Sequence, residues 1–556
     1  MQRQLALSRL VNSVLEVLLC LVAASPAVAL AAPGGLDPSF GNGGIVITSF
    51  GGTDVASAVV IQSDGKLVVA GQTNIAGNTT FALARYNPNG GLDPAFGAGG
   101  LVTTDFGSTD QAFAVALLAD GRIVTAGRRG SDVIVARHNA DGSLDSLFGS
   151  NGRVITNFGA TEQALALVVQ SDGKIVVAGR TNKDGNFDFA LARYESGGTI
   201  DRAFGTNGLV TTDFGGSVDR AFAIALQPDG KLVVAGGSDA NFALARYNSD
   251  GSLDPSFGAG GTVITTFGGS DQASAVILQP DGKIIVAGET DTGTSIDFAL
   301  ARYMPDGSLD GAFGSGGRVT TNFTGTSDDL GSAVALQFDG KILVGGTSDD
   351  NFALARYTPE GVLDSAFGSE GKVTTNLGGE DLIHALTLQP DGTIVAVGES
   401  ADRFALARYQ AFAPLSLRLV LNPEAITEFS PGDSFQFDTV MGNPGPPQTA
   451  DLYFAILLPP SAAGAPFNCP GGDPLALFGP GFSFIPTCLS DPQSFVPMAP
   501  NTVIPGGLPP SVVPDFFSGV WPAGAPSGVY TFFVALIRPG TMELLAVASA
   551  TARLKP

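Results

Sequence analysis

Short apolar runs, separated by Gly, Asp, Asn and Pro, recur along the chain from residue 36 to residue 409. In one copy the stretch 208–212 precedes an Ala-rich run at 219–226. A Pro-Asp-Gly-Lys turn then leads into 232–236, and 242–247 completes the copy. Asp-Gly between two apolar runs is a strong hairpin signal, because both residues tolerate the positive φ of a tight turn. The pattern predicts four short strands in each copy.

One motif, Leu-Asp-x-x-Phe-Gly, marks the start of every copy. It begins at Leu36, Leu92, Leu144, Ile200, Leu253, Leu309 and Leu363. Four strands in roughly fifty residues is the size of a propeller blade. A solenoid would need distinct capping repeats, whereas the end copies here look like the middle ones. We therefore expect an all-β protein with a seven-bladed β-propeller at residues 36–409.

Side-chain size and charge predict how the ring is built. Small Ala residues such as Ala112 and Ala114 mark the Ala-rich run as the crowded innermost strand. The outermost strand is then the Gly-x-Val-x-Thr stretch, and the first copy would donate residues 44–48 to the last blade, which removes an exposed edge. In every complete copy an Arg precedes the motif Asp by eight residues. We expect each pair to bond, and Arg408 to close the ring by pairing with Asp37.

Three elements of the copies, Leu-Asp-x-x-Phe-Gly, Pro-Asp-Gly-Lys-x-x-Val-Ala-Gly and Phe-Ala-Leu-Ala-Arg-Tyr, resemble the delta-60 repeat of bacterial exported and surface proteins. The resemblance covers about two thirds of the chain. It implies a propeller-like repeat and supplies no catalytic residue. The copies depart from the pattern at His138, which replaces Tyr, and at Thr393, which replaces the basic turn residue.

The N-terminus has the features of an export signal. Arg3 and Arg9 precede an apolar run, and small residues follow at Ala-x-Ala spacing near residues 27–31. We expect residues 1–31 to be a signal peptide and the protein to be secreted, periplasmic or at the cell surface, with no stable membrane insertion. The two cysteines that remain, Cys469 and Cys488, are then expected to form a disulfide.

Composition changes after Tyr409. Most of the 35 prolines follow it, and alternating segments such as 434–438, 451–458 and 529–537 indicate strands. We expect a Pro-rich immunoglobulin-like β-sandwich at 414–556, with a long insertion at about 465–515.

Charge and motif content narrow the function. The net charge of −23 argues against binding to nucleic acid. His138 and His384 are the only histidines and occupy positions where other copies carry Tyr, Phe or Ser, so both are interpreted as substitutions within the β-framework. No P-loop, Gly-x-Ser-x-Gly or His-Glu-x-x-His motif occurs. These observations favour a protein that is not an enzyme.

One acidic constellation suggests a site. An acidic residue precedes each predicted innermost strand, and ring closure would gather all seven at one mouth of the channel. These residues, the ring carboxylates, are Asp54, Asp110, Glu162, Asp219, Asp271, Asp329 and Asp381. Loops on the same face add Asn74, Asp132, Asn182, Asp239, Asp291, Asp349 and Asp402. Such oxygen ligands suit Ca²⁺ or a cationic ligand. Alternatively, each carboxylate bonds its own backbone and shapes a turn.

The lysines of the turns are expected on the opposite face as solvated residues. They are Lys66, Lys174, Lys231, Lys283 and Lys341.

Three functions remain open. The first is a monomeric, exported binding or scaffold protein that presents an acidic loop face to protein, glycan or cation, with no cofactor except Ca²⁺. The second is a propeller-type lyase or hydrolase that uses loop residues of that face. The third is an architectural component of the cell surface.

Overall fold

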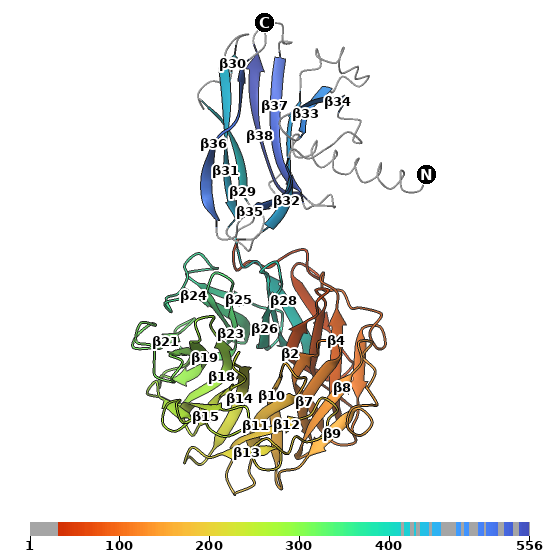
Figure 1. Cartoon of the computed structure of the whole chain (residues 1–556), viewed down its shortest axis with the longest axis vertical. Helices are drawn as coiled ribbons and strands as arrows, with labels where there is room; N and C mark the ends of the chain where they lie inside the picture. The colour runs from red at the N-terminus through yellow and green to blue at the C-terminus, as the bar shows by residue number, and fades with distance from the viewer. Residues whose placement is uncertain are drawn as a thin grey trace. The chain divides into compact units, whose positions relative to one another are not determined.

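The computed structural model describes residues 32–412 and, between 416 and 554, the backbone of the strands. Residues 33–411 form one compact unit. Its strands make seven antiparallel four-stranded sheets around a common axis, so the seven-bladed β-propeller is confirmed (Figure 1). The expected signal peptide lies outside the described residues.

The strands follow the four-run pattern of each copy. Blade 1 comprises β2 (Thr53–Ile61), β3 (Leu67–Ile75), β4 (Asn78–Tyr86) and β5 (Leu101–Thr104). Blade 2 comprises β6 (Asp110–Leu117), β7 (Ile123–Arg129), β8 (Asp132–His138) and β9 (Arg153–Thr156). Blade 3 comprises β10 (Glu162–Val169), β11 (Ile175–Thr181), β12 (Asp188–Tyr194) and β13 (Leu209–Thr212). Blade 4 comprises β14 (Asp219–Leu226), β15 (Leu232–Ser238), β16 (Asn241–Tyr247) and β17 (Thr262–Thr265).

The remaining blades repeat this order. Blade 5 comprises β18 (Asp271–Leu278), β19 (Ile284–Asp291), β20 (Ile296–Tyr303) and β21 (Arg318–Thr321). Blade 6 comprises β22 (Asp329–Leu336), β23 (Ile342–Ser348), β24 (Asn351–Tyr357) and β25 (Lys372–Thr375). Blade 7 comprises β26 (Asp381–Leu388), β27 (Ile394–Ser400), β28 (Arg403–Tyr409) and β1 (Ile45–Thr48).

Blade 7 is completed by the start of the repeat array, as the sequence predicted. Strand β1 pairs antiparallel with β28, and Ile45 lies opposite Ala407. In Figure 1 the red and orange strands at the start of the array adjoin the teal strands of blade 7. The first strand of each blade contacts the first strand of the next, including β26 with β2. The Ala-rich strands are therefore innermost, and the ring has no unpaired end.

Every innermost strand carries a β-bulge at the same point. In blade 4 the register shifts between Ala221 and Ala223, which leaves Phe222 as the extra residue. The Gly of Val-Ala-Gly lies beneath the bulge, where a Cβ on Gly236 would meet the Arg220 carbonyl at 1.9 Å. Only Gly fits so close to a neighbouring backbone. The bulge re-aims the extra side chain at the channel end of each blade.

The hydrophobic cores lie between adjacent blades. One cluster joins Val68 and Phe81 of blade 1 to Ala112 and Ile134 of blade 2. Repeated tyrosines also cross from blade to blade, as when the Tyr247 hydroxyl lies 2.8 Å from the Thr212 hydroxyl of blade 3. His138 of blade 2 is the exception, because it stands where the other blades carry this Tyr. Each interface therefore depends on the strands of two copies.

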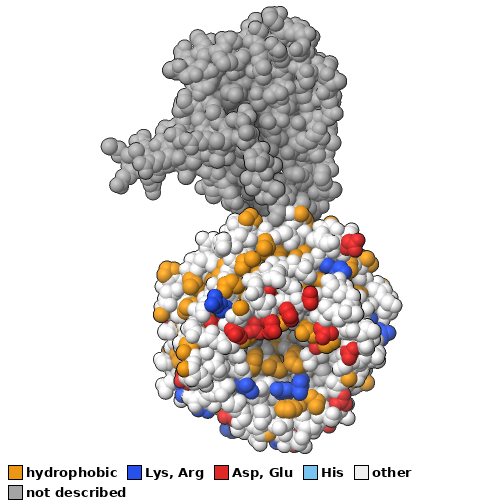
Figure 2. Space-filling model, turned by 180° about the vertical axis from the view of Figure 1, so that it is seen from behind, with side chains coloured by type: hydrophobic (Ala, Val, Ile, Leu, Met, Phe, Trp, Pro, Cys, Tyr) orange, Lys and Arg blue, Asp and Glu red, His pale blue; other side chains and the backbone are white. Residues whose placement is uncertain are grey.

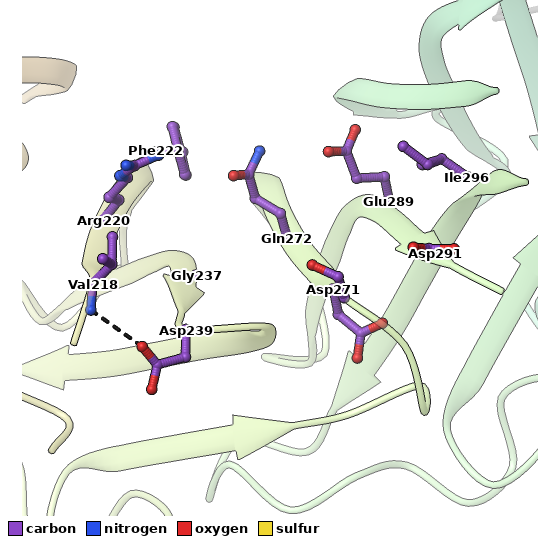
Figure 3. Close-up of a pocket in the computed structure, with 11 residues that line it drawn as sticks. Val218, Arg220, Phe222, Gly237, Asp239, Asp271, Gln272, Glu289, Asp291 and Ile296 are labelled. Atoms are coloured by element: carbon purple, nitrogen blue, oxygen red, sulfur yellow. Dashed lines mark hydrogen bonds between the residues drawn. The ribbon is translucent and has the colours of Figure 1, made fainter. Parts of the chain in front are cut away.

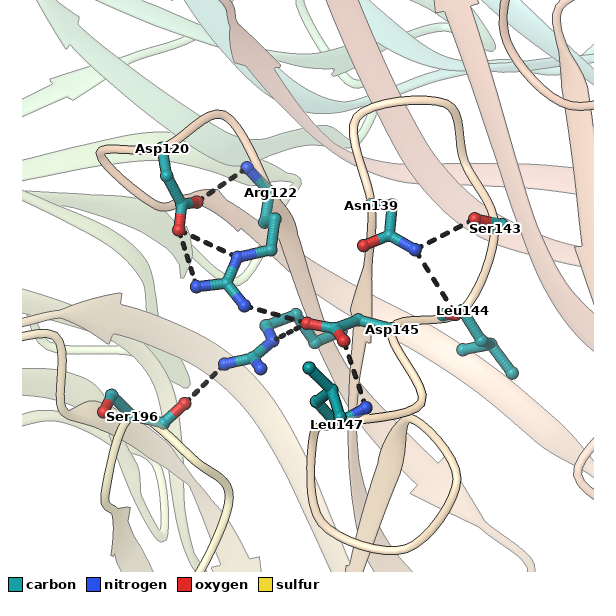
Figure 4. A network of polar contacts seen from close by, with 9 residues as sticks. Asp120, Arg122, Asn139, Ser143, Leu144, Asp145, Leu147 and Ser196 are labelled. Carbon is teal, nitrogen blue, oxygen red and sulfur yellow. Dashed lines mark hydrogen bonds and ion pairs between the residues drawn. The ribbon is translucent and has the colours of Figure 1, made fainter.

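The repeated Arg and Asp form an ion pair in every blade, and both residues are buried in all blades except blade 6, where Asp364 is partly exposed. Arg137 Nε donates to Asp145 at 2.8 Å, and its guanidinium lies 4.6 Å from the centre of the Phe148 ring. Asp145 also accepts from Arg122 and from the Leu147 amide (Figure 4). The Arg137 guanidinium donates to the Ser196 carbonyl of the next blade. The motif residues thus stabilise the contact between adjacent blades: the Asp neutralises the Arg that reaches the next blade, and the Phe stacks on its guanidinium.

The turn lysines are not free in solvent, and that expectation was wrong. Lys174 Nζ lies 2.8 Å from Asp201, which already pairs with Arg193. The hydrogen bond from Lys174, which outweighs burial, and those from the Ala203 amide and Arg193 hold the pKa of Asp201 at about 2. Lys66, Lys231, Lys283 and Lys341 reach the motif Asp of their own blades in the same way, and Arg122 does so in blade 2. The turn places the lysine amine beside the loop that carries the motif Asp. The two residues are far apart in the sequence, so their spacing does not indicate this contact.

Blade 7 makes this junction without the turn cation. Thr393 stands in place of Lys, and its hydroxyl donates to Gln389, which also accepts from Arg408 at 3.0 Å. Arg408 lies 2.8 Å from Asp37 and donates to the Pro88 carbonyl of blade 1. The pair anticipated from the eight-residue spacing therefore spans the two ends of the array.

Ten further strands follow the propeller. One sheet joins β29 (Ser416–Asn422), β31 (Ser434–Asn443) and β36 (Leu508–Val520). The other joins β30 (Glu428–Phe429), β38 (Leu544–Leu554), β37 (Gly528–Ile537), β32 (Gln448–Leu457), β33 (Pro474–Gly479) and β34 (Ser483–Cys488), with β35 (Ala499–Ile504) beside β32. The immunoglobulin-like packing of the sheets stays a prediction, and the Cys469–Cys488 disulfide lies outside the described side chains.

Candidate binding site

The ring carboxylates lie at the starts of the innermost strands and are buried. One oxygen of each accepts a hydrogen bond from a backbone amide of the loop before the strand. In blade 4 the Phe214 amide donates to Asp219 at 2.8 Å, and the other six bonds measure 2.6–2.7 Å. This geometry supports the turn-shaping role, because the carboxylate holds the loop that connects one blade to the next.

The second oxygen of these residues has a different environment. It is buried and has no hydrogen-bond partner in Asp54, Asp110, Glu162, Asp219, Asp329 and Asp381. In the seventh, Asp271, it accepts from the Thr290 hydroxyl of the neighbouring strand. Ser or Thr occupies that cross-strand position in every blade except blade 2, where Arg129 does. A hydroxyl thus faces most of these carboxylates.

The seven ring carboxylates do not converge on one point. Among the described residues, one group of three acidic side chains places its ligand atoms within 4.8 Å of one another: Asp188, Asp213 and Asp219. Burial, together with the charges of Asp213, Asp219 and Asp184, raises the pKa of Asp188 to about 6. The sequence singled out Asp219 but neither of its two neighbours.

A second feature of the face that carries the ring carboxylates is a set of side chains that vary between blades. One position on the second strand of each blade differs from blade to blade. It follows the Gly of Val-Ala-Gly and pairs with the residue just after the ring carboxylate. It is occupied in turn by Gln72, Arg128, Arg180, Gly237, Glu289, Thr347 and Glu399. The basic residues belong to blades 2 and 3, and the acidic ones to blades 5 and 7. The framework is repeated, whereas these side chains are not.

Three arginines gather on one side of the channel mouth. Arg180 lies 4.6 Å from the centre of the Phe187 ring, and Arg220 lies 5.8 Å from it. Burial and the nearby charges of Arg220 and Arg128 lower the pKa of Arg180. Within the described part of the chain none of the three forms an ion pair, and Arg220 Nε is buried without a partner. Unpaired guanidinium groups suit an anionic ligand group.

Arg220 also lines a pocket of about 200 Å³ between blades 4 and 5. Asp239, Glu289 and Asp291 contribute carboxylates to its wall, and Gln272 lies between Arg220 and Glu289 (Figure 3). Asp239 is held by the Val218 amide at 3.2 Å. Figure 2 shows acidic and basic side chains in separate groups near the middle of one propeller face. The site therefore combines a basic side with a strongly acidic side.

One carboxyl group of this acidic side has a raised pKa. Burial, reinforced by the charge of Asp328, raises the pKa of Glu289 to about 7. His384 occupies the bulge position of blade 7, and its Nε2 lies 3.4 Å from Glu399. His138, in contrast, is buried in the framework beside Thr125, so it lies away from any site.

The acidic loop residues predicted from the sequence are placed unequally. Asp239 and Asp291 line the pocket with the ring carboxylate Asp271. The sequence pattern did not predict the three arginines and Glu289, because the copies do not share these residues. Variation between copies at one fixed position is the signal that would have found them.

Seven segments of the chain match the family described as "Domain of unknown function (DUF5122) beta-propeller". They are residues 62–96, 118–148, 170–204, 227–257, 279–313, 337–367 and 389–411. Each begins just after an innermost strand and contains the turn and the strand that ends in Ala-Arg-Tyr, or Ala-Arg-His in the second. The first six also contain the Leu-Asp-x-x-Phe part of the motif, with Ile in place of Leu in the third. The match supports the β-propeller repeat and leaves the delta-60 designation as a prediction.

Two solved structures are distantly similar to part of this chain. Virginiamycin B lyase from Staphylococcus aureus is 11% identical, with 65% of this chain and 98% of that chain covered and a TM-score of 0.42. Drosophila plexin A, in complex with semaphorin 1b, is 10% identical, with 68% and 88% covered and a TM-score of 0.36. Likenesses this distant concern architecture, which hosts many functions.

The curated proteins contain no match to this chain. Among the described residues, no helix is long and apolar enough to cross a membrane.

Proposed function

We propose that this chain is an exported binding protein whose propeller holds a peptide segment with both acidic and basic groups. One observation carries the proposal: the repeat is uniform in its framework and diverges in the charged residues that face the channel mouth. Uniform framework residues account for stability in every blade. The divergent ones, Arg180, Arg220 and Glu289 among them, form no ion pair within the described residues.

Charge complementarity gives the proposed ligand its chemistry. A ligand carboxylate can take a bidentate hydrogen bond from a guanidinium of Arg180 or Arg220. A ligand ammonium or guanidinium can enter the pocket beside Glu289 and Asp291. Because Arg180, Arg220 and Glu289 are partly buried, their attraction to a ligand charge is stronger than it would be between groups fully exposed to water. Neighbouring groups of opposite charge are common in peptides, whereas glycans are mostly neutral or anionic, so we favour a peptide.

The test is binding of the full chain to an array of peptides and glycans that are acidic, basic, mixed or neutral. We expect mixed-charge peptides to be retained, and retention to fall as salt rises. Arg220→Gln should weaken binding of mixed-charge peptides at least tenfold, and Glu289→Gln should do so for the same peptides. Arg202→Gln, which removes an exposed Arg in a loop of the framework, is the charge-matched control. Equal binding by all three variants, or retention of glycans alone, would remove the proposal.

An enzymatic function has one observation in its favour. A carboxyl group with a pKa of about 7 can act as general acid or base near neutral pH, and Glu289 has this property inside a pocket. A screen of polysaccharides and peptides for turnover tests this second candidate. Activity lost in Glu289→Gln but kept in Arg202→Gln would support it, and no turnover of any substrate would leave the binding function.

A further inference from the structure

We infer that Asp188, Asp213 and Asp219 form a Ca²⁺ site at the junction of blades 3 and 4. Asp188 begins β12, Asp213 follows β13, and Asp219 begins β14 of the next blade. Their ligand oxygens lie within 4.8 Å of one another. Two oxygens on opposite sides of one Ca²⁺ are about 4.6–5.2 Å apart, so the three can share an ion without moving apart.

A buried, unsatisfied oxygen gives the cluster its second, independent support. Asp219 is fully buried, and its Oδ1 has no hydrogen-bond partner. A Cβ placed on Gly216 would lie 3.0 Å from this oxygen, so the absence of a side chain at 216 leaves space beside it. The matching oxygen is also unsatisfied in five other ring carboxylates, but among the described residues only Asp219 has two further carboxylates within 4.8 Å, with which it can share a cation that satisfies it.

The other blades show what this junction looks like without an ion. Asp132 occupies the position of Asp188 in blade 2, and Asn157 donates to it at 2.6 Å. Asp297 occupies the same position in blade 5, and Asn322 donates to it at 2.8 Å. At the junction of blades 3 and 4 the Asn is replaced by Asp213, which removes the donor and adds a charge. Three carboxylates then meet with no basic residue paired to them within the described residues.

Neighbouring groups further define the coordination. Asn186 donates to Asp188 Oδ1 at 3.1 Å and to the Gly216 carbonyl at 3.2 Å, and so links the two loops. Gly215 donates to Asp213 Oδ1 at 2.6 Å, which leaves the second oxygen of Asp213 available. Three monodentate carboxylates are fewer than the six to eight ligands of Ca²⁺, so water completes the shell. Mg²⁺ has shorter bonds and a stricter geometry, and this spacing suits it less.

The site would stabilise the arginine side of the channel mouth. The loop between β11 and β12 carries Phe187, whose carbonyl accepts from the Asp219 amide at 2.6 Å. Phe187 stacks against Arg180. An ion bound to Asp188 and Asp219 would therefore fix the loop that positions this guanidinium, without contacting the proposed peptide. The inference does not depend on that peptide.

The experiment is calorimetric titration of the chelated full chain with Ca²⁺ alone, with a thermal melt in parallel. We expect one Ca²⁺ per chain and a rise in Tm of about 2–5 °C at saturation. Asp213→Asn recreates the Asp–Asn pair of the other junctions, so it should fold, lose Ca²⁺ affinity at least tenfold and keep its Tm without Ca²⁺. The control is Asp105→Asn. Asp105 holds the position of Asp213 at the junction of blades 1 and 2, where Thr80 stands in the place of Asp188.

Each outcome decides the matter. Binding that is weakened by Asp213→Asn and unchanged by Asp105→Asn supports the site. No Ca²⁺ binding by the native chain, or equal binding by both variants, overturns it, and the peptide array is read separately.

Discussion

Arg408 and Asp37 form, from opposite ends of the repeat array, the ion pair that the other six blades make within eight residues. The pair is buried, and Arg408 also stacks 4.7 Å from the centre of the Phe40 ring. It is the only one of the seven that lacks a second cation from the turn, because Thr393 replaces Lys. The closure of the ring therefore depends on a single charge pair and on strand β1.

Asp37→Asn should loosen this closure. The substitution leaves the Arg408 charge buried with neutral partners, and breaking a buried pair in this way costs about 3–5 kcal/mol. We expect a lower denaturant midpoint and faster proteolysis near residues 32–50. Asp64→Asn, which removes an exposed carboxylate beside Lys66, should change stability by less than about 0.5 kcal/mol. Equal effects of the two variants would contradict the closure role.

His138 should make the protein less stable in mild acid. Burial lowers the pKa of His138 to about 4, against the ordinary 6.5 of a His in the unfolded chain. Protonation therefore favours the unfolded state, so this contribution is complete above pH 6.5 and is lost as the pH falls towards 4. The loss amounts to about 3 kcal/mol. Unfolding measured at pH 7, 5.5 and 4 tests this. His138→Phe should flatten the profile, and a profile altered instead by His384→Gln would contradict it.

His138→Tyr should stabilise the protein at pH 7. In the other blades the Tyr hydroxyl bonds a Thr of the preceding blade, as Tyr194 does with Thr156 at 2.7 Å. Thr104 occupies that position for blade 2 and has no such bond with His138. A new buried hydrogen bond contributes about 0.5–1.5 kcal/mol. The gain should disappear in His138→Phe, which lacks the hydroxyl, and equal stability of the two variants would count against it.

Two adjacent glycines should respond differently to a methyl group. A Cβ on Gly236 would lie 1.9 Å from the Arg220 carbonyl, whereas on Gly237 it would meet nothing closer than 3.8 Å. Gly236→Ala must push the bulge away and should cost at least about 1–3 kcal/mol. Gly237→Ala should be nearly neutral. Chemical denaturation of both variants measures the difference, and the same midpoint for both would show that the bulge yields freely.

Asp54→Asn separates the structural role of the ring carboxylates from a metal role. Its Oδ1 lacks a partner, as does the Thr73 hydroxyl on the facing strand. An Asn can still accept from the Phe50 amide and can donate to Thr73, so stability should hold to within about 1 kcal/mol. Asp54→Ala should cost about 1–3 kcal/mol, because it leaves that amide without its acceptor. A loss of Ca²⁺ binding in Asp54→Asn would instead assign this carboxylate to an ion.

The sequence by itself determined the framework of this protein. Seven copies with Asp-Gly turns and four apolar runs specify strands, blade count and ring closure, since each signal is local or repeated. The spacing of Arg85 and Asp93 even anticipated a contact, because eight residues bracket one loop.

The tertiary structure decided which residues meet across blades. Lys174 reaches Asp201 across a hairpin, and Asp188 meets Asp219 across a blade junction, so neither contact follows from a short sequence spacing. The role of Arg180, Arg220 and Glu289 in a binding site likewise depends on the position of their blades around the channel. A repeat encodes the contacts that every copy makes, whereas a site depends on where the differing copies stand around the ring.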